Sequence, residues 1–167
     1  MLHITIPAVE LWDPVNEKFI NLKAQSLQLE HSLVSLQKWE SKWCKPFLIK
    51  HAHSLEETID YVRCMTITQN VNPNIYNYMT DENIEQVNEY INARMTAAWF
   101  AEEKTNKGNS EQVTGEIIYH WMIALNIPSE YRKWHLNSLL ALIKTCSIKN
   151  QPPKKMSTNE ILRRNEA

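Results

Sequence analysis

The sequence predicts an α+β fold that is mostly α-helical, in which a small N-terminal antiparallel sheet precedes a helical body of about four to five helices. Apolar residues alternate with polar residues in the first thirty positions, which is the period of a half-buried strand. From residue 31 onward they recur every three to four positions, which is the period of an amphipathic helix. The chain has 167 residues, 43% of them hydrophobic, which is sufficient for one domain with a substantial core.

The N-terminal thirty residues carry three strand signals. Residues 2–6 alternate between apolar and polar side chains, which predicts the first strand. Residues 13–16 form a plausible turn with proline at its second position, which predicts a hairpin with Trp12 and Phe19 near each other across it. Residues 27–29 also alternate and predict a third strand.

Helical spacing and capping signals account for most of the remaining chain. Ser54 is followed three residues later by Glu57, which is the spacing of a capping box. Thr80 or Asp81 is a second candidate cap. The five helices expected lie near residues 30–43, after Ser54, through Ile84, Val87 and Ile91, over 113–127 and over 129–147.

The charge distribution divides the chain at about residue 148. Residues 1–148 hold 13 basic and 17 acidic side chains, whereas residues 149–167 hold five basic and two acidic ones. Two prolines at positions 152 and 153 cannot continue a helix. We expect one globular domain over 1–148, with a sheet over 1–30 and helices over 31–148. Residues 149–167 are expected to be a flexible basic linker with a short helix, and residues 102–110 a mobile polar loop.

Composition excludes several classes of function. The two glycines, Gly108 and Gly115, cannot form a glycine-rich phosphate loop. Three separated cysteines contain no Cys-x-x-Cys pair, which argues against a zinc ribbon or a redox motif. The net charge of −1 argues against a dedicated nucleic-acid-binding domain. The N-terminus does not have the pattern of a signal peptide, and the longest apolar stretch, 117–127, is about half a membrane span.

The histidines and cysteines do not form a recognisable reactive motif. His51 and His53 are two positions apart, and a polar loop before the helix is the favoured interpretation. Glu116 and His120 share a helix face but lack the second histidine of a metalloprotease helix. A cysteine–histidine pair formed only in the fold remains open in principle. We therefore assign no catalytic, metal-binding or cofactor-binding residue and expect no small-molecule substrate.

Tryptophan is the more informative residue type. Most of these side chains should be core, but tryptophan is also enriched at interaction hot spots. We expect Trp43 and Trp134, at the edges of two helical stripes, to remain partly exposed. The candidate partner-binding residues are Trp39, Trp43, Trp134, Lys38 and Lys42. Aromatic and basic residues together can also hold single-stranded nucleic acid, but the lysines here are few and one acidic residue interrupts them, so an amphipathic helix is favoured.

A resemblance to a known family is carried by six segments, Ser32–Leu48, Met95–Ala97, Tyr119–Pro128, Trp134–Asn137, Leu139–Ile143 and Asn150–Ser157. On these segments the chain is similar to tail assembly proteins of long-tailed phages and prophages of Gram-positive bacteria, of the tail assembly chaperone kind.

The resemblance implies a non-enzymatic role in the cytoplasm of the host bacterium. A tail assembly chaperone binds the phage tape measure protein and helps tail tube subunits polymerise around it. A groove that accepts a helix would suit a long helical tape measure chain. Two alternatives remain: a structural virion component, such as a head–tail connector or tail completion protein, and a nucleic-acid-binding or regulatory phage protein.

Overall fold

The computed structural model describes residues 1–49, 53–98 and 112–150. Within these residues the strands are β1 (Leu2–Ile6), β2 (Val9–Asp13), β3 (Lys18–Leu22) and β4 (Gln25–Leu29), and the α-helices are α1 (Leu33–Trp43), α2 (Leu55–Met65), α3 (Asp81–Asn92), α4 (Gly115–Ala124) and α5 (Leu136–Lys149). Two short 3-10 helices, η1 (Ile75–Tyr78) and η2 (Ser129–Lys133), precede α3 and α5. This is the α+β, mostly helical fold that the sequence predicts. The predicted loop at 102–110 and the expected C-terminal helix lie outside the described residues.

The four strands form one long antiparallel ribbon. β1 pairs with β4, and β2 pairs with β3. The register that places Ile6 opposite Gln25 continues, after a break of two residues on each side, with Val9 opposite Leu22. The break contains Pro7, whose ring holds φ near −65°, far from the extended φ of an antiparallel strand. The predicted hairpin and third strand are confirmed, but they form two successive ladders.

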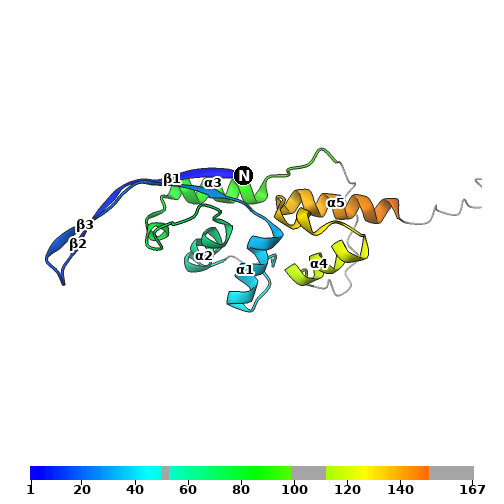
Figure 1. The fold of residues 1–167 in the computed structure, drawn as a ribbon, viewed down its shortest axis with the longest axis horizontal. Coiled ribbons are helices and arrows are strands. Elements are labelled where there is room, and N and C mark those ends of the chain that lie inside the picture. The colour runs from blue at the N-terminus through cyan, green and yellow to red at the C-terminus, as the bar shows by residue number, and fades with distance from the viewer. Residues whose placement is uncertain (50–52, 99–111, 151–167) are drawn as a thin grey trace, which may run out of the picture.

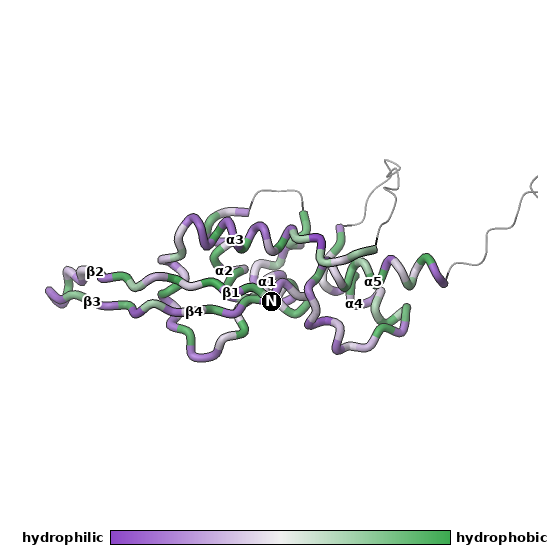
Figure 2. The backbone as a smooth tube through the Cα atoms, turned by 90° about the horizontal axis from the view of Figure 1, so that it is seen from above, coloured by the Kyte–Doolittle hydropathy of each residue, from purple (hydrophilic) through white to green (hydrophobic). Residues whose placement is uncertain are grey.

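The outer half of this ribbon extends away from the helices (Figure 1). We call residues 9–22, which comprise β2, β3 and their turn, the arm. Seen from above, the arm again continues beyond the helical body (Figure 2). The inner half, β1 and β4, lies beside α3 (Figure 1) and contributes four fully or almost fully buried side chains, Ile4, Ile6, Leu27 and Leu29. The hydrophobic core is therefore built mainly on the inner half of the ribbon, and of the outer half Leu22 joins it, with Leu11 packed against it.

Local capping interactions set the beginnings of three helices. The Ser54 hydroxyl accepts the Glu57 N–H, and the Glu57 carboxylate accepts the Ser54 N–H, which confirms the predicted capping box of α2. Thr80 caps α3 by the same reciprocal arrangement with Asn83. Ser32 accepts the N–H of Ser35 at the start of α1. These hydrogen bonds satisfy N–H groups that a helix leaves without an internal partner.

The predicted helix over 129–147 is wrong in its N-terminal part, whereas its remainder, from Leu136 onward, is helical. The chain forms η2, becomes extended at Trp134, and begins α5 after His135. The imidazole of His135 accepts the Asn137 N–H at 3.2 Å, and its other ring nitrogen lies 2.9 Å from the Tyr90 carbonyl oxygen. The Leu136 N–H donates to the His31 carbonyl at 2.7 Å. These contacts with distant segments replace the hydrogen bonds of a continuous helix.

Candidate functional site: protein-binding surfaces

The predicted aromatic stripe on α1 is divided between core and surface. Trp39 is fully buried, and its indole N–H donates to the Glu57 carbonyl at 3.0 Å. Trp43 stacks on it, with ring centroids 5.9 Å apart, and is half-buried. The expected partial exposure of Trp43 is confirmed. Trp39, in contrast, is not available for contact with a partner, which corrects its assignment as a partner-binding residue. Trp39 lies one helical turn before Trp43, nearer the middle of α1, where the side chain is buried.

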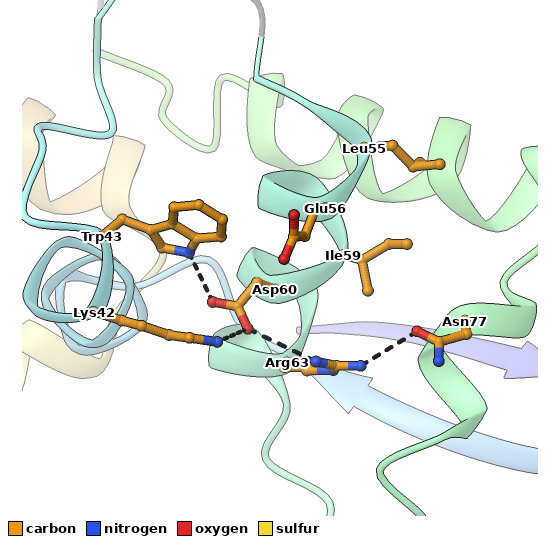
Figure 3. Close-up of a pocket in the computed structure, with 8 residues that line it drawn as sticks. All are labelled: Lys42, Trp43, Leu55, Glu56, Ile59, Asp60, Arg63 and Asn77. Carbon is orange, nitrogen blue, oxygen red and sulfur yellow. Dashed lines mark hydrogen bonds and ion pairs between the residues drawn. The ribbon is translucent and has the colours of Figure 1, made fainter.

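Trp43 borders a pocket between α1 and α2 of about 500 Å3 (Figure 3). A buried carboxylate, that of Asp60, lines this pocket and accepts hydrogen bonds from Lys42 at 2.5 Å and from the Trp43 indole at 2.9 Å. Arg63 lies 3.9 Å from the same carboxylate and donates to the Asn77 side chain at 3.3 Å. We call this the α1–α2 pocket.

The electrostatics of the α1–α2 pocket keep Asp60 ionised. Burial alone would raise the pKa of the Asp60 carboxyl, but the hydrogen bonds from Lys42 and Trp43 and the charges of Lys42 and Arg63 outweigh it and lower the pKa. The aliphatic side chains of Leu55 and Ile59 complete the lining. The pocket therefore offers apolar surface beside fixed charges of both signs, which is suited to an amphipathic peptide segment.

Trp134 lies on a different surface. Its side chain is 49% exposed and packs against Tyr131, with ring centroids 4.3 Å apart. It borders a second pocket, of about 590 Å3, together with Met95 and Glu30. The expected exposure of Trp134 is confirmed, but the two predicted tryptophans line separate pockets. The predicted lysines also separate, because Lys38 is exposed on α1 and is not part of the lining of the α1–α2 pocket, whereas Lys42 is.

The arm is an exposed apolar surface that sequence reasoning did not select as a site. Trp12 stands opposite Phe19 in the register, as predicted, with ring centroids 4.9 Å apart. Their side chains are 54% and 62% exposed, and Ile20 is 40% exposed. The available signal was that apolar residues occupy both faces of the outer hairpin. Apolar side chains on both faces of a hairpin would each need another element packed over them to be buried. The described helices do not lie over the arm (Figure 1).

The residues considered for metal binding and catalysis have ordinary structural roles where they are described. His53 stacks on Phe47, with ring centroids 4.6 Å apart, and its Nε2 lies 3.1 Å from the Phe47 carbonyl. His120 is exposed on α4, and His51 lies outside the described residues. Among residues 1–49, 53–98 and 112–150, no group of three or more His, Cys, Asp or Glu side chains could hold a metal ion. Burial raises the pKa of the Cys64 thiol, which disfavours the nucleophilic thiolate.

Comparison with known proteins gives no match: no family model matches the chain, and no curated protein or solved structure is significantly similar to it. Within the described residues, no helix has both the length and the apolarity needed to cross a membrane.

Proposed function

We propose that this protein is a non-enzymatic factor of bacteriophage tail morphogenesis, and specifically a tail assembly chaperone. It would act in the cytoplasm of the host bacterium, where it would bind the tape measure protein and tail tube subunits. The proposal rests on the resemblance of segments such as 32–48 and 119–128 to phage tail assembly proteins. It requires no cofactor, membrane or small-molecule substrate.

The observation that best supports the proposal is the exposure of large apolar side chains around a well-packed body. Among the residues that the structure describes, 21 hydrophobic side chains are buried in the core, so the exposed ones are not the result of poor packing. Trp134 and Leu55 are 49% and 65% exposed and each borders a pocket. Exposed aromatic and aliphatic groups beside pockets are typical of protein-binding surfaces.

The α1–α2 pocket is the surface that best fits a helical tape measure chain. An amphipathic helix could place apolar residues against Leu55 and Ile59 while its polar residues meet Lys42, Glu56 or Arg63, which line the same pocket. This is the helix-in-groove mode of recognition, in which apolar anchors recur every three to four residues. Charges of both signs at the pocket would fix the orientation of the bound helix.

The test is co-purification with the tape measure protein and, separately, the tail tube protein encoded in the same genome. We expect wild-type protein to retain the tape measure chain and the variants Leu55→Asp and Trp134→Ala to lose at least part of this binding. Ile123→Ala is the matched control, because Ile123 is 64% exposed on α4 and lies outside both pockets. A wild-type protein that binds neither tail protein would refute the proposed function. Normal binding by both folded variants would refute the proposed surfaces alone.

Purified virions separate the chaperone from the structural alternative. A chaperone is absent from the finished particle, whereas a connector or tail completion protein remains in it at a fixed copy number. Mass spectrometry of purified particles therefore distinguishes the two roles. Detection of this protein at a stoichiometric level in the particle would exclude the chaperone.

A further inference from the structure

We propose that the arm is a self-association element, in which the outer edge of β2 in one molecule pairs antiparallel with the outer edge of β3 in a second molecule of this protein. Within the described residues, β2 and β3 pair only with each other. Each therefore presents one edge of unpaired N–H and C=O groups, which is a template for another strand. A two-stranded ribbon is at best marginally stable alone, so added strands would stabilise it.

The geometry of the arm allows its own register to be repeated between molecules. In an antiparallel pair, residues alternate between those that hydrogen-bond to the partner strand and those whose backbone groups point outward. Residues that face each other in β2 and β3, such as Leu11 and Ile20, belong to the same class. The outward groups of β2 therefore meet the outward groups of β3 from a second molecule in the same register.

This repeated register brings chemically matched side chains together on both faces. On one face, Leu11 of each molecule meets Ile20 of the next. On the other face, the exposed pair Trp12 and Phe19 becomes one continuous row of aromatic rings. Cross-strand aromatic and aliphatic pairs are the contacts that stabilise sheets. The exposed apolar area of the arm, which has no cover within the described residues, would be covered by like residues.

Charge complementarity selects this arrangement over a symmetric dimer. The strand residues of β2 include two acidic side chains, Glu10 and Asp13, whereas β3 has one charged side chain, Lys18. Pairing β2 with β3 places Asp13 of one molecule opposite Lys18 of the next. Pairing β2 with β2 around Leu11 would instead place Asp13 opposite Val9 and the two Glu10 side chains at diagonal positions on one face, with no basic residue opposite an acidic one. Charged side chains often protect strand edges from pairing, but opposite signs on the two edges favour head-to-tail pairing.

Head-to-tail contacts leave a free β2 edge at one end and a free β3 edge at the other. Such heterologous interfaces form rings when the rotation closes and open filaments when it does not. The protein alone should therefore form species larger than a dimer. This inference does not depend on the proposed function, since self-association is measured without any phage partner.

The first test is the mass of the full-length protein as a function of concentration, measured by sedimentation velocity. We expect wild-type mass to rise beyond that of a dimer. The double variant Trp12→Ser, Phe19→Ser should remain monomeric with an unchanged far-ultraviolet circular dichroism spectrum, because both side chains are exposed and neither belongs to the core. Ile123→Ser, which removes an exposed apolar residue on α4, should associate as wild type does. A monomeric wild type, a dimer that does not grow, or association that survives in the double variant would overturn the proposal.

A charge reversal provides a second test that retains the aromatic pair. Lys18→Glu should weaken association, because it places two acidic side chains at the paired positions, and Lys18→Gln, which only removes the charge, should weaken it less. Asp13 is left unchanged, because its carboxylate also accepts the N–H groups of Val15 and Asn16 in the turn. Unchanged association of Lys18→Glu would contradict the charge argument.

Disulfide trapping determines which edges pair. Glu10 stands opposite Asn21 in the arm, so a mixture of Glu10→Cys protein and Asn21→Cys protein, both carrying Cys44→Ser, should form a linked heterodimer on oxidation. Mass spectrometry of the linked peptides identifies the pair. A disulfide formed by Glu10→Cys protein alone would indicate β2–β2 pairing centred on Glu10, and one formed by Leu11→Cys protein alone would indicate β2–β2 pairing centred on Leu11. Either result would overturn head-to-tail pairing.

Discussion

The carboxylate of Glu40, in α1, accepts a hydrogen bond from the backbone N–H of Gly115, the first residue of α4, at 2.7 Å. Its other oxygen accepts the Phe47 N–H at 2.9 Å. Glu40 is buried, so one side chain fastens both the chain segment after α1 and the beginning of α4. A carboxylate near a helix N-terminus is also favoured by the helix dipole.

Glu40→Gln should lower the free energy of unfolding by about 2 kcal/mol, because glutamine has one acceptor oxygen for two buried N–H donors. One of the two backbone N–H groups would then face an amide NH2. Urea denaturation at neutral pH measures the change. Glu85→Gln, at an exposed position of α3, is the control and should change stability by less than about 0.5 kcal/mol. Equal stability of the two variants would show that the Glu40 contacts contribute little.

Gly115→Ala should also be destabilising, although alanine is the better helix former. An added Cβ would lie 2.7 Å from Gln37 Cγ and 3.0 Å from a Glu40 oxygen, so α4 would have to move away from α1. We expect a net loss of about 1–2 kcal/mol in unfolding free energy, since overpacking outweighs helix propensity. Adding Gln37→Ala removes one of the two clashes and should recover part of the loss. The prediction is wrong if Gly115→Ala unfolds at the wild-type urea concentration.

Acidification should destabilise the protein through His31, which packs between α2 and the start of α5. Its Nδ1 lies 2.6 Å from the buried Tyr61 hydroxyl, and its ring lies 5.1 Å from that of His135. Burial, together with the nearby His135, lowers the pKa of His31 to about 3. The unfolded chain, with a pKa of about 6.5 for this group, therefore takes up a proton that the folded state excludes. Stability is retained above that value and is lost as the pH falls towards the folded-state pKa.

The expected loss from His31 is about 2 kcal/mol between pH 7 and pH 5. Burial also lowers the pKa of His135, although the Tyr90 carbonyl and Glu30 act against it, so this residue adds to the loss. Urea denaturation of wild type and His31→Gln at the two pH values measures it, and the variant should show the smaller decrease. His120→Gln, at an exposed position, should retain the full wild-type decrease. The same decrease in wild type and His31→Gln would remove His31 as its cause.

Local signals in the sequence predict where most helices and strands lie. The interruption before the last helix depends on tertiary contacts and could not be predicted from such signals. Alternation over residues 2–6 and the capping box at Ser54 depend on neighbours within a few positions, and both predictions are confirmed. The end of η2 at Trp134 depends instead on hydrogen bonds from the following residues to segments 45 and more than 100 positions away. No periodicity in the last helix carries that information.

For the candidate site, too, the sequence predicts local spacing, whereas tertiary packing determines which side chains are exposed. Helical spacing correctly placed Trp39 and Trp43 on one stripe, but only the packing of α2 against α1 determines that the first is core and the second borders a pocket. The arm was predicted as a hairpin, including its Trp12–Phe19 pair. Its exposure could not be predicted, because the sequence does not indicate which strands the helices cover.

The break in the ribbon at Pro7 leads to a prediction about the arm's attachment. The backbone of Gln28 bonds outward, to Ile67 and to the Thr68 side chain, so His3 and Gln28 are a non-hydrogen-bonded pair. Counting along the shared register, Ala8 and Lys23 occupy a position where an antiparallel ladder would form hydrogen bonds. The fixed φ of proline just before this position favours the break.

Pro7→Val should therefore join the two ladders, because valine adopts the extended φ that proline cannot. We expect the amides of residues 8 and 23 to exchange with deuterium about fivefold more slowly, the effect of one added hydrogen bond of about 1 kcal/mol. Residue-resolved hydrogen exchange measures this, on the Trp12→Ser, Phe19→Ser background so that self-association does not protect the arm. Pro14→Ala, in the turn at the tip of the arm, is the control and should leave both amides unchanged. Rapid exchange at both positions in Pro7→Val would show that the proline does not cause the break, and that twist of the ribbon or packing of β1 against α3 separates the strands.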